Sequence, residues 1–197
     1  MTRYSMAIDL ERCLGCQACM VSCAAENEVP LGSHRLRLQT TVAGRFPDLA
    51  AEYRMEQCFQ CEDSPCVDVC PTGANRKTAE GIVLVDRNKC IGCKACVVSC
   101  PYSMRYMHPE GYADKCTFCD HRLADGREPA CVETCPTGAR IFGDLEDPAS
   151  ELRNTLDAAV TVTQLRPETK TQPRIFYTNP PLGRQTGLGV APESEWS

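Results

Sequence analysis

Residues 90–101 read CIGCKACVVSCP, and this stretch decides the fold. Its four cysteines are spaced C-x2-C-x2-C-x3-C and are followed by Pro101, which is the bacterial motif for a [4Fe-4S] cluster. Three closely spaced thiolates on one loop can reach three iron corners of a cubane, and the fourth cysteine then points away. The stretch therefore predicts an iron–sulfur protein.

The other cysteines repeat this motif with variations. All sixteen cysteines of the 197-residue chain fall into four groups of four. The groups are Cys13, Cys16, Cys19 and Cys23; Cys58, Cys61, Cys66 and Cys70; Cys90, Cys93, Cys96 and Cys100; and Cys116, Cys119, Cys131 and Cys135. The second and fourth groups lengthen the middle step but keep the flanking C-x2-C and C-x3-C-P steps. Four complete sets of thiolates predict four [4Fe-4S] clusters, with all sixteen cysteines as metal ligands.

Two other uses of cysteine fit this pattern less well. Disulfides need an oxidising compartment, and the N-terminal MTRYSMAIDL lacks the apolar stretch of a secretory signal. Structural zinc pairs two separate C-x2-4-C knuckles, whereas here the third cysteine follows at once. A zinc-binding structural scaffold is the alternative from a different functional class.

The composition fits a protein whose interior is filled by clusters. Aromatic residues make up only 6 % of the chain, and the mean hydropathy is −0.30, so side chains alone make a thin core. The net charge of −5 makes nucleic acid an unsuitable partner. No run of eighteen apolar residues occurs, so we expect no direct membrane span.

An internal repeat organises the chain. MAIDLERCLGCQACMVSC (6–23) aligns without gaps on VLVDRNKCIGCKACVVSC (83–100), with nine of eighteen positions identical. PCVDVCPTGA (65–74) likewise resembles PACVETCPTGA (129–139). A tandem duplication of a two-motif unit explains this order. The sequence predicts an α+β fold made of two interlocked bacterial-ferredoxin-like modules, with an inserted β-hairpin and an extended C-terminal tail.

Loop length indicates which motifs share clusters. Only nineteen residues separate Cys70 from Cys90, which is a hairpin-sized connection, so motifs two and three are expected to interlock. Motif one then pairs with motif four by exclusion. The rival pairing, one with two and three with four, follows the duplication. In two-cluster ferredoxins the fourth cysteine of each motif binds the neighbouring cluster.

This rule gives four predicted ligand sets. Cluster 1 is bound by Cys13, Cys16, Cys19 and Cys135, and cluster 2 by Cys23, Cys116, Cys119 and Cys131. Cluster 3 is bound by Cys58, Cys61, Cys66 and Cys100, and cluster 4 by Cys70, Cys90, Cys93 and Cys96.

The modules take the following boundaries. Residues 1–34 and 101–147 form the module of motifs one and four, and residues 58–100 that of motifs two and three. Residues 35–57 form the inserted hairpin, with strands on either side of a turn at Gly44. Residues 148–197 form a short helix and an extended tail that contacts partner subunits.

No set of side chains reads as a catalytic centre, so we expect an electron-transfer protein that is not itself catalytic. His121 follows Cys119 by two residues. It is either a hydrogen-bond donor to a cluster sulfur or a partly exposed side chain near a partner surface.

The chain resembles a known family along nearly its whole length. The resemblance rests on MAIDLERCLGCQACMVSCAAENEVP, CPYSMRYMHPEGYADKCTFCDHR, ACVETCPTGARIFGDLEDP and the LRPE and FYTNPP segments of the tail. These are similar to the four-cluster iron–sulfur subunits of molybdopterin oxidoreductases in the dimethyl sulfoxide (DMSO) reductase group, above all those of polysulfide and thiosulfate reductases. Cys93 is present, where some relatives carry another residue and a three-iron cluster.

The resemblance implies the same pairing and a linear relay used in anaerobic respiration. Cluster 1 faces a catalytic subunit that carries molybdopterin, and cluster 4 faces an integral-membrane subunit that interacts with quinone. The chain is then peripheral on the cell membrane through its partners, on the periplasmic face after co-export with the catalytic subunit, or alternatively on the cytoplasmic face. The alternative complexes are a DMSO reductase, a sulfite or formate dehydrogenase, and a hydrogenase-linked enzyme.

Overall fold

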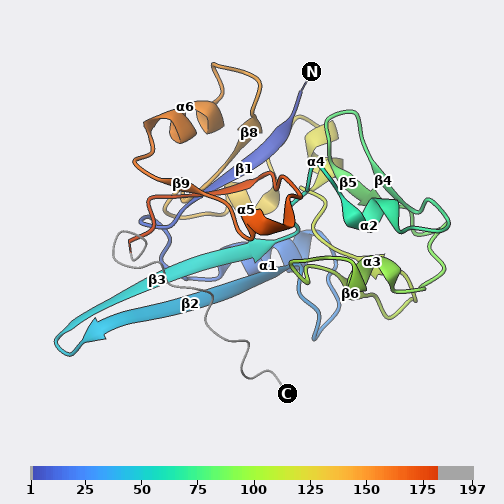
Figure 1. Cartoon of the computed structure of the whole chain (residues 1–197), viewed down its shortest axis with the longest axis horizontal. Helices are drawn as coiled ribbons and strands as arrows, with labels where there is room; N and C mark the ends of the chain where they lie inside the picture. The colour runs from blue at the N-terminus through green and yellow to red at the C-terminus, as the bar shows by residue number, and fades with distance from the viewer. Residues whose placement is uncertain (1, 182–197) are drawn as a thin grey trace.

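A four-stranded sheet brings the first strand of the chain beside strands from its last third in the computed structural model, which describes residues 2–181 (Figure 1). The order of the sheet is β8-β1-β10-β9. Its strands are β1 (Tyr4–Asp9), β8 (Arg140–Asp144), β10 (Ile175–Thr178) and β9 (Val162–Thr163). β1 runs antiparallel to β8 and parallel to β10, so the first strand lies between two strands from the last third of the chain.

Part of the C-terminal tail forms a strand in the chain's own sheet, and its contact with partner subunits stays a prediction. Ile175–Thr178 forms β10 within the chain's own sheet, and Ile175 and Tyr177 are buried. The Tyr177 hydroxyl donates a hydrogen bond to the Met55 carbonyl oxygen at 3.0 Å. A four-residue strand in a Pro-rich stretch has too short a pattern to be identified from sequence. Residues 182–197 of the predicted tail lie outside the described residues.

The first copy of the repeat packs against motif four. After β1 the chain passes through the first cysteine loop into α1 (Ala18–Glu26). α1 contacts α5 (Ala130–Glu133), which carries Cys131, and α4 (Asp120–Ala124) begins directly after Cys119. Cysteines that are distant in sequence are thereby brought to one side of the molecule.

The second copy of the repeat packs against motif two. α2 (Pro65–Asp68) contacts α3 (Ala95–Val98), and β4 (Asn75–Lys77) pairs with β5 (Val83–Val85). Gly81 has a φ of +81° in the connection between these strands, a backbone conformation that glycine adopts without strain. β6 (Tyr106–Met107) and β7 (Ala113–Asp114) form a small hairpin after motif three.

A long hairpin extends from the rest of the molecule between motifs one and two (Figure 1). β2 (Leu36–Arg45) pairs with β3 (Asp48–Gln57), and its turn lies at Phe46 and Pro47 instead of at Gly44, where the sequence predicts it. The Tyr53 ring of β3 lies against the first cysteine loop, where a Cβ atom on Gly15 would be 2.6 Å from Tyr53 Cδ1. The base of the hairpin is therefore part of the surroundings of motif one.

The last helix covers the edge of the four-stranded sheet. α6 (Glu151–Ala158) packs on β8 and buries Leu152, and the Ser150 hydroxyl accepts a hydrogen bond from the Arg153 amide at 3.1 Å. A serine in this position satisfies one free amide of the first helical turn. The short 3-10 helix η1 (Pro167–Thr169) then leads to β10.

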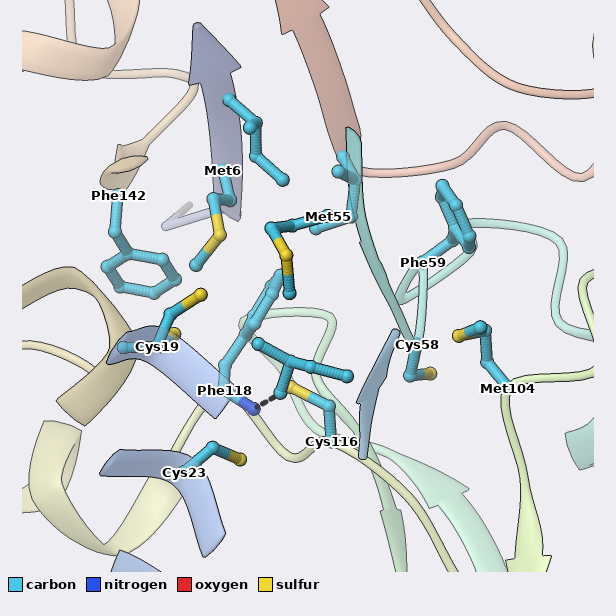
Figure 2. Packing of buried hydrophobic residues seen from close by; sticks show 14 of the residues in the cluster. Met6, Cys19, Cys23, Met55, Cys58, Phe59, Met104, Cys116, Phe118 and Phe142 are labelled. Carbon is cyan, nitrogen blue, oxygen red and sulfur yellow. Dashed lines mark hydrogen bonds between the residues drawn. The ribbon is translucent and has the colours of Figure 1, made fainter. Parts of the chain in front are cut away.

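The first half of the molecule is built around motifs one and four, and the second half around motifs two and three. One hydrophobic cluster runs through both halves, and cysteines are part of it (Figure 2). In Figure 2, Met55 and Phe118 lie between Cys19 of α1 and Cys58 of the second half. Within residues 2–181, none of the helices is both long and apolar enough to cross a membrane.

Candidate metal centres

The first predicted ligand set lines a single cavity. Cys13, Cys16, Cys19 and Cys135 surround it, although Cys135 lies more than a hundred residues from the others in the chain. Apolar side chains, including Ile8 and Met55, complete the wall. The space between the sulfur atoms is therefore enclosed by ligands that suit a soft metal and by side chains that exclude water.

The fourth predicted ligand set lines a second cavity, formed by Cys70, Cys90, Cys93 and Cys96. Two backbone amides point at its sulfur atoms. The amide of Asn75 donates to Cys70 Sγ at 3.4 Å, and that of Ala113 donates to Cys90 Sγ at 3.5 Å. Such donors stabilise negative charge on sulfur.

The other eight cysteines also meet in two groups. The Asn27 side-chain amide donates to Cys23 Sγ at 3.6 Å and to Cys119 Sγ at 3.7 Å, which joins motifs one and four. Burial raises the pKa of Cys23 to about 12, and the thiols of Cys131 and Cys119 add to this effect. Burial also raises the pKa of Cys61 to about 12, with contributions from Cys58, Cys66 and Cys100.

These buried thiols are neutral at pH 7 in the metal-free chain, so incoming iron has to displace their protons. Cys70 behaves differently. Burial opposes its ionisation, but hydrogen bonds from Asn75 and Thr72 outweigh burial and lower its pKa to about 7. Cys135, at the equivalent position of the other half, has its pKa lowered in the same way, with Thr137 as the main donor.

Three buried cations test whether the interior suits an anionic group. Arg105, Lys115 and Arg140 are at most 6 % exposed, and no carboxylate within residues 2–181 forms an ion pair with them. Two of the nitrogen atoms of Arg140, Nε and Nη1, have no hydrogen-bond partner among the described residues. Burying an unpaired charge is costly. A cluster bound by four thiolates brings the negative charge that offsets these cations, so the residues present fit the group.

The cysteine groups follow one another through the molecule. Burial is the main cause that raises the pKa of Cys116 in the first half. Cys58 of the second half is close enough to contribute to the same rise. Figure 2 shows Cys116 between Cys23 and Cys58. Its Sγ atom accepts a hydrogen bond from the Phe118 amide at 3.4 Å. Lys115 also joins the halves, because its ammonium group donates to the carbonyl oxygens of Val83 and Cys116.

Only two of the sixteen cysteines are exposed. They are Cys16 and Cys93, at the same position of the two repeat copies. Each has exposed apolar neighbours: Leu14 (64 % exposed) and Val21 (70 %) near Cys16, and Ile91 (67 %) and Val98 (86 %) near Cys93.

Sequence reasoning missed several residues around the sulfur atoms. Asn27, Arg105 and Arg140 follow the last cysteine of a motif by only four or five residues, but no pattern in the sequence marks them as neighbours of sulfur. His121, which the sequence offers as a sulfur donor, instead bonds Glu26 Oε1 at 2.8 Å, and Asn27 makes the contacts to sulfur. The signal that could have found Arg140 is its position directly after the repeated CPTGA segment.

Comparisons with known proteins identify relatives that are iron–sulfur subunits. Two models of a 4Fe-4S dicluster domain match residues 5–71 and 49–145. The chain is 44 % identical to the B subunit of tetrathionate reductase from Salmonella typhimurium, over 89 % of this chain and 72 % of that protein. It is also 44 % identical to the B subunit of polysulfide reductase from Wolinella succinogenes, over 88 % of this chain and 93 % of that protein. The arsenate respiratory reductase iron–sulfur subunit of a Shewanella species is 35 % identical, over 89 % of this chain and 95 % of that subunit.

Proposed function

The protein belongs to the family of iron–sulfur electron-transfer subunits of DMSO reductase-group molybdopterin oxidoreductases, and from this premise we propose that it relays single electrons through four [4Fe-4S] clusters. When bound, each cluster accepts and donates one electron at a time. The chain's own residues hold the clusters, exclude water from them and place them in a series.

The proposed ligands are the four sets given by the interlocked pairing. The shared cavities support the sets of cluster 1 (Cys13, Cys16, Cys19, Cys135) and cluster 4 (Cys70, Cys90, Cys93, Cys96). Asn27, which bonds two sulfur atoms of different motifs, supports cluster 2. The influence of Cys58, Cys66 and Cys100 on the pKa of Cys61 supports cluster 3, although burial has the larger effect.

The observation that carries the relay is the exposure of one cysteine in each copy of the repeat. A protein that moves electrons between two partners needs two open ends and a protected middle. Cys16 and Cys93 provide the ends, and the remaining cysteines are buried or half-buried. We propose that Cys16 lies in the contact with the molybdopterin catalytic subunit and Cys93 in the contact with a quinone-binding membrane subunit.

The substrate class of the complex follows from the relatives. Two of the proteins compared above are subunits of polysulfide and tetrathionate reductases, both of which act on sulfur compounds, so we propose a respiratory complex of this kind. The chain would then be held at the membrane by its partners, on the periplasmic face. No group in the chain is proposed as catalytic.

The test uses the complete complex, purified anaerobically. The wild-type chain should contain about sixteen iron and sixteen sulfide per molecule. Cys93→Ser should block electron exchange with quinol, while an artificial dye should still reduce the catalytic subunit. Cys16→Ser should cut off the catalytic subunit and leave the other three clusters reducible by quinol.

Two results would overturn the proposal. Near-stoichiometric zinc with little iron would favour the structural scaffold. If Cys16→Ser, and not Cys93→Ser, lost quinol access, the relay would run in the opposite orientation.

A further inference from the structure

The two repeated CPTGA segments end in different residues. CPTGA at 70–74 is followed by Asn75, and CPTGA at 135–139 is followed by Arg140. The two residues are structurally equivalent, because each is the first residue of a strand, β4 or β8, and each is 4 % exposed. The first half thus has a buried positive charge at a point where the second half has a neutral amide.

Arg140 places its charge between two cysteine sets of the first half. Burial acts to lower its pKa, but the nearby thiols of Cys131, Cys19 and Cys116 outweigh burial and raise it. Cys19 belongs to the proposed cluster 1, and Cys131 and Cys116 to cluster 2. The Nη2 atom of Arg140 donates to the Gln57 side-chain oxygen and lies 3.1 Å from Met6 Sδ, so its hydrogen-bond partners are uncharged.

Arg105 supplies the corresponding charge in the second half from a different part of the chain. Its Nη1 atom donates to Asn75 Oδ1 at 2.6 Å, and its Nη2 atom donates to Cys66 Sγ at 2.8 Å. The amide at the repeat position therefore orients a guanidinium that comes from the segment after motif three. Besides Cys66, the thiols of Cys58, Cys96 and Cys100 act on Arg105, and these belong to the proposed clusters 3 and 4.

The remaining buried arginines are neutralised by acids. Arg35 pairs with Asp114 at 2.8 Å, Arg122 pairs with Glu26 at 2.7 Å, and Arg174 pairs with Glu62. Arg105 and Arg140 are the buried arginines of residues 2–181 whose charge is left free to act on the cysteine sets.

Reduction adds an electron to a cluster that is already negative. A fixed positive charge in a low-dielectric interior stabilises the reduced form, and a hydrogen bond to a ligand sulfur acts in the same direction. This inference rests on the ligand sets of the proposed function. We infer that Arg105 and Arg140 have the same role, and that each raises the reduction potentials of the clusters in its own half. Arg105 acts most strongly on the Cys58/Cys61/Cys66/Cys100 cluster, because it donates directly to Cys66.

The experiment is a redox titration of the anaerobically purified complex, followed by electron paramagnetic resonance. In Arg105→Gln, the reduced-to-oxidised ratio of one second-half cluster should fall at least tenfold at a fixed ambient potential, which equals 59 mV for a one-electron couple. The clusters of the first half should keep their potentials. Arg140→Gln should instead lower a potential in the first half and leave the potentials of the second half unchanged.

Two further variants keep the test decisive. Arg174→Gln removes a buried arginine whose charge is already neutralised, so it is the matched control and should shift no potential by a comparable amount. Asn75→Ala leaves the charge of Arg105 in place but removes its orienting bond, so it should lower the potential of the Cys58/Cys61/Cys66/Cys100 cluster by less than Arg105→Gln does; the Asn75 side chain also bonds Cys70, so the other second-half cluster is left out of this comparison. If Arg105→Gln fails to assemble, Asn75→Ala and Arg105→Lys carry the measurement.

Iron and sulfide content separates this inference from the proposed function. If the wild type lacks four clusters, the proposed function fails. If all four clusters are present and the potentials do not change in Arg105→Gln, or change equally in Arg174→Gln, the inference about the arginines is wrong and the relay stands.

Discussion

The two copies of the repeat have nearly the same cysteine loop in different surroundings. In the first copy, β1 lies in the middle of a four-stranded sheet and leads to the nine-residue α1, whereas in the second copy β5 pairs with β4 alone and leads to the four-residue α3. The first loop is covered by the Tyr53 side chain and the second by the backbone at Gly111. Duplication thus preserved the geometry that holds a cluster and changed the surface around it, which is what two different partners require.

The largest effect is expected from the cysteine that closes each interlock. Cys70→Ser should remove or alter the cluster held by Cys90, Cys93 and Cys96, because Cys70 lines their cavity. The loss should approach four iron atoms per chain. Iron content and electron paramagnetic resonance of the intact complex measure it.

Cys135→Ser is the matched variant in the other half and should affect the cluster of Cys13, Cys16 and Cys19. If Cys70→Ser instead disturbed the cluster of Cys58, Cys61 and Cys66, the two halves would not be interlocked as proposed.

The next prediction compares the side chain that covers the first cysteine loop with the backbone that covers the second. A Cβ atom at Gly92 would lie 2.6 Å from the Gly111 carbonyl oxygen, a backbone atom that cannot move aside easily. At Gly15 it would meet the Tyr53 ring instead. Both glycines have positive φ, which adds strain of roughly 1–3 kcal/mol for alanine. Gly92→Ala should therefore lose more iron than Gly15→Ala, as measured by iron content after purification.

Removing the aromatic ring provides the control. Gly15→Ala combined with Tyr53→Ala should recover part of the lost iron, whereas no side-chain substitution should rescue Gly92→Ala. Equal losses in the two single variants would mean that the different covers have no consequence.

A more local effect should reach only the first half. Ile175 is fully buried in β10, next to β1, and its replacement by alanine should cost about 2–5 kcal/mol. Hydrogen exchange of the intact protein should show faster exchange in β1 and β8 and unchanged protection in β5. Val83→Ala, in β5, should show the opposite distribution.

The smallest expected effect concerns α6, which supports the sheet of the first half alone. Ser150→Ala removes the cap of the helix and should destabilise it by about 1 kcal/mol, seen as faster exchange at the Arg153 amide. Ser150→Thr keeps a hydroxyl acceptor and should retain most of the protection. Faster hydrogen exchange in the loop around Cys93 would contradict the independence of the two halves.

The cysteine motifs were predictable because each one encodes a local loop. Spacing alone places Cys90, Cys93 and Cys96 around one cavity, and the short connection to Cys70 indicates its neighbour. β10 was not predictable as a core strand, since four residues carry too little periodicity and its partner β1 lies at the other end of the chain. Arg105 escaped prediction for a related reason: its role depends on Asn75, thirty residues away, and on a sulfur that only folding brings near.

The position of β1 also bears on synthesis of the chain. Its neighbours β8 and β10 end at residues 144 and 178, so at about 5–20 residues per second the first strand waits on the order of ten to thirty seconds for its second neighbour. Met6 and Ile8, fully buried in the finished protein, stay exposed on the ribosome during that interval. β1 is thus made before either of its neighbours, and its place in the sheet is complete only after residue 178 has been synthesised.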